Sequence, residues 1–177
     1  GKADAIAMCR TTIADPEWPN KVRKGREEDI TPCIKCFYCL DGEKVARRFG
    51  CSVNPTAGRN LRLDALTKPI TKSRKVLVIG GGPAGMQCAI TASQRGHDVT
   101  LMEKTDKLGG QLKFGTHEYF KEGLRDFMNY LVRQTYKAGV KVLLNTTAEP
   151  ESVDAMGFDV IVAAPGANPI IPPIPGA

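Results

Sequence analysis

A glycine-rich turn between an apolar strand and a helix limits the folds open to this 177-residue chain more than any other feature. In the stretch "VLVIGGGPAGMQCA", Gly80, Gly82 and Gly85 follow G-x-G-x-x-G spacing. The first glycine would make the turn, the second would let backbone amides approach a pyrophosphate, and the third would let helix and strand pack closely. The pattern predicts a dinucleotide-binding βαβ unit, with a purely structural glycine turn as the alternative.

Hydrophobic periodicity places further regular elements around and after this turn. Strands and helices alternate along the chain, which is typical of an α/β domain with a parallel sheet and right-handed crossovers. The predicted strands are 75–80, 97–104, 140–145 and 159–164, and the predicted helices are 83–96 and 118–138. The proline-rich stretch 169–176 is expected to be extended. Together these elements predict a Rossmann-like, three-layer domain.

An acidic residue occurs at the position where dinucleotide-binding folds use a carboxylate. Glu103 ends the second predicted strand, eighteen residues after Gly85, and could accept hydrogen bonds from ribose hydroxyls. The stretch "EKTDKLGGQL" follows, and its Gly109–Gly110 pair would allow a second close approach of backbone to cofactor. The second approach favours the longer FAD over NAD.

Four of the six cysteines lie within nineteen residues, at Cys33, Cys36, Cys39 and Cys51. The first three could point their sulfurs at neighbouring corners of one compact object, and the fourth could close it from across a short helix. A C-x2-C-x2-C run is a known source of ligands for a [4Fe–4S] cluster, which is the preferred interpretation. Structural zinc and unligated or disulfide-bonded thiols are the alternatives. Cys88 is expected to be a small buried hydrophobe.

The chain before the cysteines predicts a single β/α unit. Residues 3–8 form an apolar run fit for a buried strand, followed by a loop and a helix. We expect Asp15 to cap this helix and Pro16 to be its first residue. A single strand cannot bury itself, so the unit should belong to a larger sheet or barrel, or dock on the rest of the chain. A domain boundary is expected near Thr71.

Composition and charge narrow the classes of function. The chain is 42% hydrophobic and 25% charged, and no apolar run approaches the roughly 20 residues of a membrane helix. Basic clusters at 21–26 and 46–62 accompany a net charge of +6. Acidic residues are interleaved with these clusters and no aromatic residues alternate with the bases, so nucleic-acid binding is not expected. With no signal peptide in view, we expect a cytoplasmic location and a start inside a larger gene product.

Several motifs together resemble those of one enzyme family. The stretches "RTTIADPEWPNKV", "CIKCFYCLD", "CSVNP", "VLVIGGGPAGMQCA", "GHDVTLMEK", "LGGQL" and "PGANPIIPPIPG" resemble the iron–sulfur flavoenzymes related to 2,4-dienoyl-CoA reductase, enoate reductases and trimethylamine dehydrogenase. The resemblance covers nearly the whole chain. It implies an old-yellow-enzyme type TIM barrel with FMN, a [4Fe–4S] segment, an FAD domain and an inserted NAD(P)H domain. By resemblance, 1–30 is the last β/α unit of the barrel, 31–58 the cluster segment, 59–74 a linker and 75–177 the incomplete FAD domain.

The resemblance also implies site residues. Cys9 and Arg10 would contact the FMN phosphate, because barrel phosphate sites are built from the loops after strands seven and eight. The FAD contacts would come from the glycine loop and from residues that follow it. They are Gly80, Gly82, Ala84, Gly85, Glu103, Lys104, Gly110, Gln111, Lys121 and Ala148.

The implied activity is NAD(P)H-dependent reduction of an activated C=C bond in an enoate or enoyl-CoA. Hydride would reach FAD, single electrons would cross the cluster, and FMN would deliver hydride to the substrate, while the protein supplies placement and electrostatics. The partners would be the rest of the barrel and the NAD(P)H domain, and an oligomer is compatible with the family. The chain alone is not expected to turn over an enoate. Two alternatives stay open: an amine dehydrogenase of the trimethylamine dehydrogenase type, and a non-catalytic, zinc-stabilised nucleotide-binding module.

Overall fold

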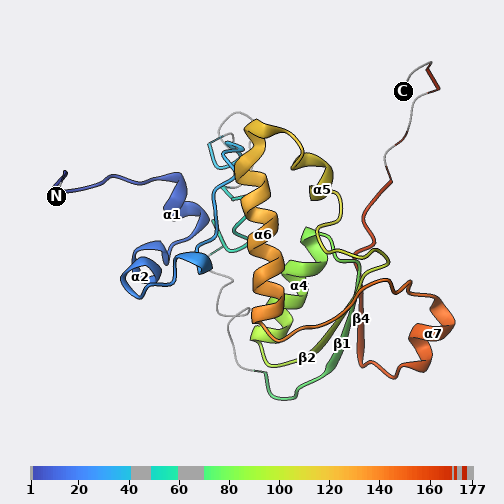
Figure 1. Ribbon diagram of the computed structural model, residues 1–177. Helices are drawn as coiled ribbons and strands as arrows, with labels where there is room; N and C mark the ends of the chain where they lie inside the picture. The colour runs from blue at the N-terminus through green and yellow to red at the C-terminus, as the bar shows by residue number, and fades with distance from the viewer. Residues whose placement is uncertain (1, 41–48, 60–69, 169, 171–172, 175–177) are drawn as a thin grey trace.

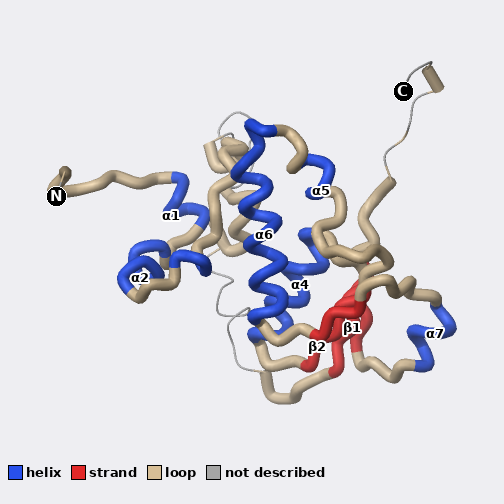
Figure 2. Tube along the Cα trace, viewed as in Figure 1, coloured by secondary structure: helices blue, strands red, loops and turns tan. Residues whose placement is uncertain are grey.

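The fold is built on a parallel four-stranded sheet in the order β3-β2-β1-β4. The computed structural model describes residues 2–40, 49–59, 70–168, 170 and 173–174 (Figure 1). The strands are β1 (Lys75–Ile79), β2 (Asp98–Met102), β3 (Lys141–Leu143) and β4 (Val160–Ala163). All four predicted strands are therefore confirmed, each shorter than the apolar run that indicated it. The two at the centre, β1 and β2, are labelled in Figure 2.

The central strands are buried on both faces. Leu77 and Val78 in β1 are both 0% exposed, although successive side chains of a strand point to opposite sides. In the β1–β2 ladder Leu77 lies opposite Thr100, and in the β1–β4 ladder it lies opposite Ile161. Burial on both faces explains why the β1 sequence is a continuous apolar run and does not alternate between apolar and polar residues.

Two helices cover one face of the sheet. Helix α4 (Pro83–Gln94) packs on β1 and β2, and helix α6 (Glu122–Lys137) packs on α4 (Figure 1). The largest cluster of buried side chains lies on this face and includes Met86 of α4 and Leu131 of α6. The helix predicted at 83–96 is confirmed.

Helix α7 (Pro150–Ala155) lies beyond the other side of the sheet and was not predicted (Figure 1). Its Val153 packs with Leu77 and Met102 in a second, smaller core cluster. The helix has six residues and only Val153 is fully buried, so hydrophobic periodicity gives almost no signal for it.

The segment before α6 is more divided than the sequence predicts. Helix α5 (Leu112–Gly115) and the 3-10 turn η2 (Tyr119–Lys121) precede α6, which begins at Glu122 and not near residue 118. The backbone of Glu118 is extended, with ψ 126°, and this conformation interrupts the helical path.

The N-terminal part differs most from prediction. The strand expected at 3–8 is not formed: these residues are exposed, and no described strand lies beside them to complete their hydrogen bonds. Helix α1 (Arg10–Ala14) occupies the predicted loop. Helix α2 (Trp18–Arg23) starts later than expected, with Glu17 at its N-cap. Asp15 lies outside the helix but accepts the Glu17 amide on Oδ1 at 3.0 Å, which is the type of hydrogen bond that a capping residue makes. The 3-10 turn η1 (Glu27–Asp29) follows.

Three predictions fall mainly outside the described residues. They concern the short helix between the third and fourth cysteines, most of the linker 59–74, and most of the extended tail 169–176. Within the described part of the chain, none of the helices combines the length and the apolar character needed to cross a membrane.

Replacing Leu131 by alanine should lower the free energy of unfolding by about 2–5 kcal/mol, because the lost side chain leaves a cavity in the core. The leucine is 1% exposed, whereas Tyr136 on the same helix is 52% exposed. Urea unfolding followed by circular dichroism measures the loss, and Tyr136→Ala should change stability by less than about 1 kcal/mol. Equal losses in the two variants would contradict this packing.

Candidate functional site

The glycine loop connects β1 to α4 through two backbone contacts that leave no room for a side chain. Gly80 has φ +106°, and a Cβ there would lie 2.2 Å from the carbonyl oxygen of Ala164, just after β4. A Cβ on Gly85 would lie 1.9 Å from the carbonyl oxygen of Gly80. The third glycine thus lets α4 pack closely on β1, as the spacing predicts, and the first also brings the end of β1 against the segment after β4, which the spacing does not predict.

Gly82 differs from these two because its surroundings are open. It is the N-cap of α4, with φ −76°, and the nearest atom to a Cβ there would be the Cα of Gly110 at 3.9 Å. Gly110 itself has φ +52° and approaches the loop closely, since its own Cβ would lie 2.8 Å from the Cα of Gly82. Two glycine-containing loops therefore face each other at the N-terminus of α4, where unpaired N–H groups and the helix dipole favour an anion.

Glu103 follows β2 and is 8% exposed. One carboxylate oxygen accepts from the Gly81 amide at 2.7 Å, and the other accepts from the Thr105 amide at 2.9 Å and its hydroxyl at 2.8 Å. Burial alone would raise the pKa of Glu103, but these hydrogen bonds and the charge of Lys113 hold it below its ordinary value of 4.5. Since an ionised carboxylate has about four acceptor positions, about one remains for a ligand hydroxyl.

The remaining candidate FAD contacts are distributed unevenly. Gln111 donates from Nε2 to the carbonyl oxygen of Ala167 at 2.8 Å, which ties the second glycine loop to the segment after β4. In the part of the chain that the structure describes, Lys104, Lys121 and Ala148 make no hydrogen bond to the glycine loop. Lys121 immediately precedes α6, and Ala148 packs at the smaller core cluster. Ala84 is exposed in the first turn of α4.

The cysteine loop has an unusual backbone. Lys35 and Phe37, on either side of Cys36, both have left-handed backbone angles, with φ 57° and 59°. Such angles cost about 1–3 kcal/mol each in a residue other than glycine and occur where surrounding structure enforces them. Left-handed residues alternating with ordinary ones turn successive N–H groups toward one side, as in the backbone nests of phosphate and iron–sulfur sites.

The four thiols of the predicted cluster lie near one another. All six cysteines are free thiols, and Cys36 Sγ lies 3.3 Å from the Ser52 hydroxyl next to Cys51. Burial raises the pKa of the Cys39 thiol, and Cys51, Cys33 and Cys36 are close enough to raise it further. Cys51 is held in place by its neighbours, because Val53 is buried and Asn54 donates to the Ile13 carbonyl at 2.8 Å.

The spacing of these thiols bears on which metal they suit. Among residues 2–40, 49–59 and 70–168, no three His, Cys, Asp or Glu side chains are arranged to hold one metal ion. A cubane has four irons, each of which takes its own thiolate, so its ligands need not converge on a single point. The chemistry of four neighbouring thiols therefore suits a [4Fe–4S] cluster.

The predicted FMN-phosphate residues lie beside the cysteine loop. The guanidinium of Arg10 stacks over the Phe37 ring, 4.5 Å from its centroid, while Cys9 is exposed at the start of α1. Sequence reasoning missed this contact and the left-handed residues of the loop, because neither leaves a pattern in the residue types. It also missed Thr105, although a threonine two residues after a strand-ending acid is a recognisable turn signal.

An α/β domain with a glycine loop, preceded by a cysteine segment, defines the class of protein. Residues 74–177 match the model of the family described as pyridine nucleotide-disulphide oxidoreductase, and the chain belongs to that family. Membership implies binding of FAD and NAD(P)H. The resemblance to iron–sulfur flavoenzymes is confirmed, because the similar proteins belong to that group.

Three known proteins show the similarity. A Thermoanaerobacter brockii protein named NADH oxidase is 42% identical over all of this chain and 27% of its own. A solved 2-naphthoyl-CoA reductase is 41% identical with a TM-score of 0.91, over 99% of this chain and 27% of its own. Histamine dehydrogenase from Rhizobium sp. 4-9 is 31% identical with a TM-score of 0.86, over 95% and 25%. The chain thus spans about a quarter of the length of these proteins.

Two glycine variants should separate folding from cofactor binding. Gly85→Ala should destabilise the domain by about 3 kcal/mol or more, because its Cβ would overlap a backbone carbonyl. Gly82→Ala should fold but lose most bound flavin, because its methyl group would occupy the open space at the N-terminus of α4. Urea unfolding and the flavin absorbance of purified protein measure the two effects. If Gly85→Ala were as stable as the unchanged protein, the first expectation would be refuted. If Gly82→Ala kept all of its flavin, the second would be refuted.

The hydrogen bonds to Glu103 should produce a pH-dependent contribution to stability. Because its folded-state pKa lies below 4.5, the ionised carboxylate stabilises the fold above that pH, and the contribution is lost as pH falls through the folded-state value. Glu103→Gln should therefore be less stable than the unchanged protein at pH 7, and the difference should shrink below about pH 4.5. Urea unfolding across pH checks this; Glu151→Gln, at an exposed site in α7, should leave the profile unchanged. A difference that stays constant with pH would contradict the expectation.

Proposed function

We propose that this chain is the electron-transfer portion of an NAD(P)H-dependent iron–sulfur flavoprotein oxidoreductase that reduces activated C=C bonds of the enoate or enoyl-CoA type. The observation that carries the proposal is the placement of the cysteine loop against the domain that contains the glycine loop. A Cβ on Gly123 of α6 would lie 3.4 Å from the Cys33 carbonyl oxygen, so helix and loop are in direct contact.

In this proposal each group of residues has a distinct task. Cys33, Cys36, Cys39 and Cys51 hold a [4Fe–4S] cluster, which supplies one-electron transfer when bound. The glycine loop and the N-terminus of α4 bind the FAD diphosphate through backbone N–H groups. The further FAD contacts are Ala84, Glu103, Lys104, Gly110, Gln111, Lys121 and Ala148.

Glu103 and Arg10 have roles that follow from their chemistry. Glu103 keeps its negative charge and offers its remaining acceptor position to a ribose hydroxyl, while its other bonds fix the glycine loop. Arg10, with the neighbouring Cys9, contacts the FMN phosphate from beside Phe37, since a planar guanidinium can stack on a ring and still donate to phosphate oxygens.

The similarity to 2-naphthoyl-CoA reductase supports the proposed reduction of C=C bonds, because this solved structure has a higher identity and TM-score than histamine dehydrogenase. An amine dehydrogenase is the second candidate, because histamine dehydrogenase shares the fold over 95% of the chain. In the full-length protein that contains this chain, substrate-dependent NAD(P)H oxidation by enoates or enoyl-CoA esters supports the first candidate. Amine-dependent reduction of an added dye, without NAD(P)H, supports the second.

Metal analysis of protein purified without oxygen tests the cysteine assignment. We expect about four irons and four acid-labile sulfides per chain, with an absorbance shoulder in the visible range. Replacing any one of Cys33, Cys36, Cys39 and Cys51 by serine should lower the iron content severalfold. Cys88→Ala is the matched control and should keep the iron, since Cys88 lies in α4. Stoichiometric zinc with no iron would overturn the proposal in favour of a zinc-stabilised nucleotide-binding module.

A further inference from the structure

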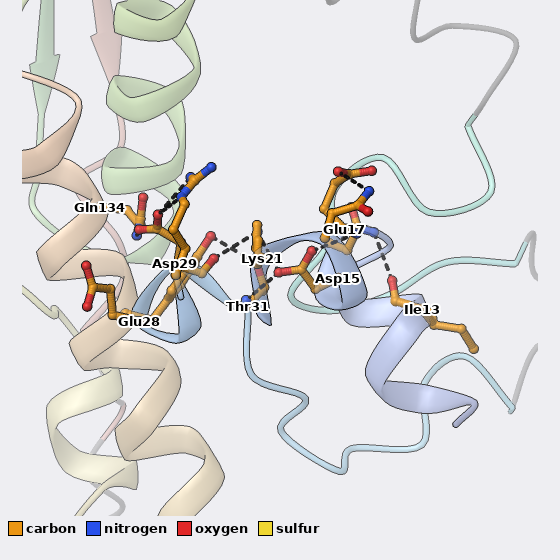
Figure 3. Close-up of polar contacts among 12 residues, drawn as sticks. Ile13, Asp15, Glu17, Lys21, Glu28, Asp29, Thr31 and Gln134 are labelled. Atoms are coloured by element: carbon orange, nitrogen blue, oxygen red, sulfur yellow. Dashed lines mark hydrogen bonds and ion pairs between the residues drawn. The ribbon is translucent and has the colours of Figure 1, made fainter. Parts of the chain in front are cut away.

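A buried carboxylate links the segment before the cysteines to the domain that contains the glycine loop. Asp29, at the end of η1, is 3% exposed, and both of its oxygens receive the ammonium of Lys137 at 2.6 and 2.7 Å. Gln134 donates to it at 2.9 Å and Arg26 at 2.7 and 2.8 Å (Figure 3). Charge-assisted bonds of this kind are short, directional and among the stronger hydrogen bonds in proteins.

Four residues of α6 share this contact. Tyr130, Arg133, Gln134 and Lys137 stand at i, i+3, i+4 and i+7, which places them on one face of the helix. The Thr31 hydroxyl donates to the Tyr130 hydroxyl at 2.9 Å, and Arg133 donates to the Glu28 carbonyl. These four side chains are therefore bonded to Glu28, Asp29 and Thr31, and Thr31 lies two positions before Cys33.

A second carboxylate extends the network on the other side of η1. Lys21 donates to Asp15 at 2.6 Å and to the Asp29 carbonyl at 2.8 Å, and Asp15 accepts the Thr31 amide at 2.8 Å (Figure 3). The segment that leads into the cysteine loop is thereby bonded to α6, to Lys21 of α2 and to Asp15 before α2.

The electrostatics keep Asp29 ionised. Burial by itself would raise the pKa of Asp29, but hydrogen bonds from Lys137, Gln134 and Arg26 hold it well below its usual range. Lys137 and Arg26 remain about half exposed, so solvent and salt weaken each pair, while the carboxylate itself is enclosed. Loss of the charge would leave two cations around a neutral, buried group.

We propose that Asp29 is a positioning residue that fixes the cysteine loop on α6 and so sets the spacing between the four thiols and the glycine loop. The route is continuous: the glycine loop opens α4, α4 packs on α6, and α6 holds residues 28–31 and meets Cys33 through Gly123. The functional meaning of this spacing rests on the proposed electron transfer, because electron-transfer rates fall steeply with distance. The docking itself does not rest on it.

Amide hydrogen exchange on this chain tests the proposal. Asp29→Asn keeps the shape of the side chain and removes its charge, and it should speed exchange in residues 30–40 about tenfold or more while β1 and β2 exchange as before. Lys137→Met removes one donor and should give a smaller rise in the same segment. Asp126→Asn is the matched control, because Asp126 is exposed on the same helix; it should leave both regions unchanged.

The outcomes separate this proposal from the proposed function. Unchanged exchange in residues 30–40 in both variants, or equal acceleration throughout the sheet, would overturn the role of Asp29. This measurement needs no bound iron, so it decides the question even where metal analysis rejects the cluster. In the iron-loaded full-length protein, Asp29→Asn should slow electron delivery to the substrate about tenfold, with the rate of flavin bleaching by NAD(P)H unchanged. Equal slowing of both steps would contradict a positioning role.

Discussion

The fold depends on the close approach of backbone to backbone at the glycine loop. Gly85 lies against the carbonyl of Gly80, and Gly80 lies against that of Ala164, so β1, β4 and α4 meet where no Cβ fits. This contact sets the angle at which α4 leaves the sheet, and α6 packs on α4 in turn. The same approach exposes the N-terminus of α4 beside Gly110, so one steric constraint produces both the core packing and the candidate anion site.

The cysteine loop is a second constraint, and it needs support from outside. Two left-handed residues within the loop, Lys35 and Phe37, raise its conformational free energy relative to an ordinary turn. The loop's own residues provide little to offset this, since Phe37 and Tyr38 are 55% and 41% exposed. Contacts at both ends supply the difference: Cys33 and Ile34 pack at α6, and Val53 beyond Cys51 is buried in the main core.

The sequence predicts the parts of this structure that depend on local patterns. The β1 strand, the glycine turn and α4 follow from an apolar run, fixed glycine spacing and helical periodicity, and the structure confirms them. Residues 3–8 also read as a strand, but strand formation requires a neighbour, and none lies beside them in the described residues. Helix α7 is too short for its period to be recognised. The bonds of Asp29 to α6 join residues 105 and 108 positions apart, and no local rule pairs them.

The polar character of the contact at Asp29 has a physical consequence that an apolar contact would lack. Apolar surfaces attract without direction and tolerate sliding by a helical turn, whereas a carboxylate bonded to Lys137, Gln134 and Arg26 has one arrangement that satisfies every group. A displaced register would leave a buried charge without partners, at a cost of several kcal/mol. The network therefore favours one position of residues 28–31 on α6, which is what the proposed electron transfer would require of this segment.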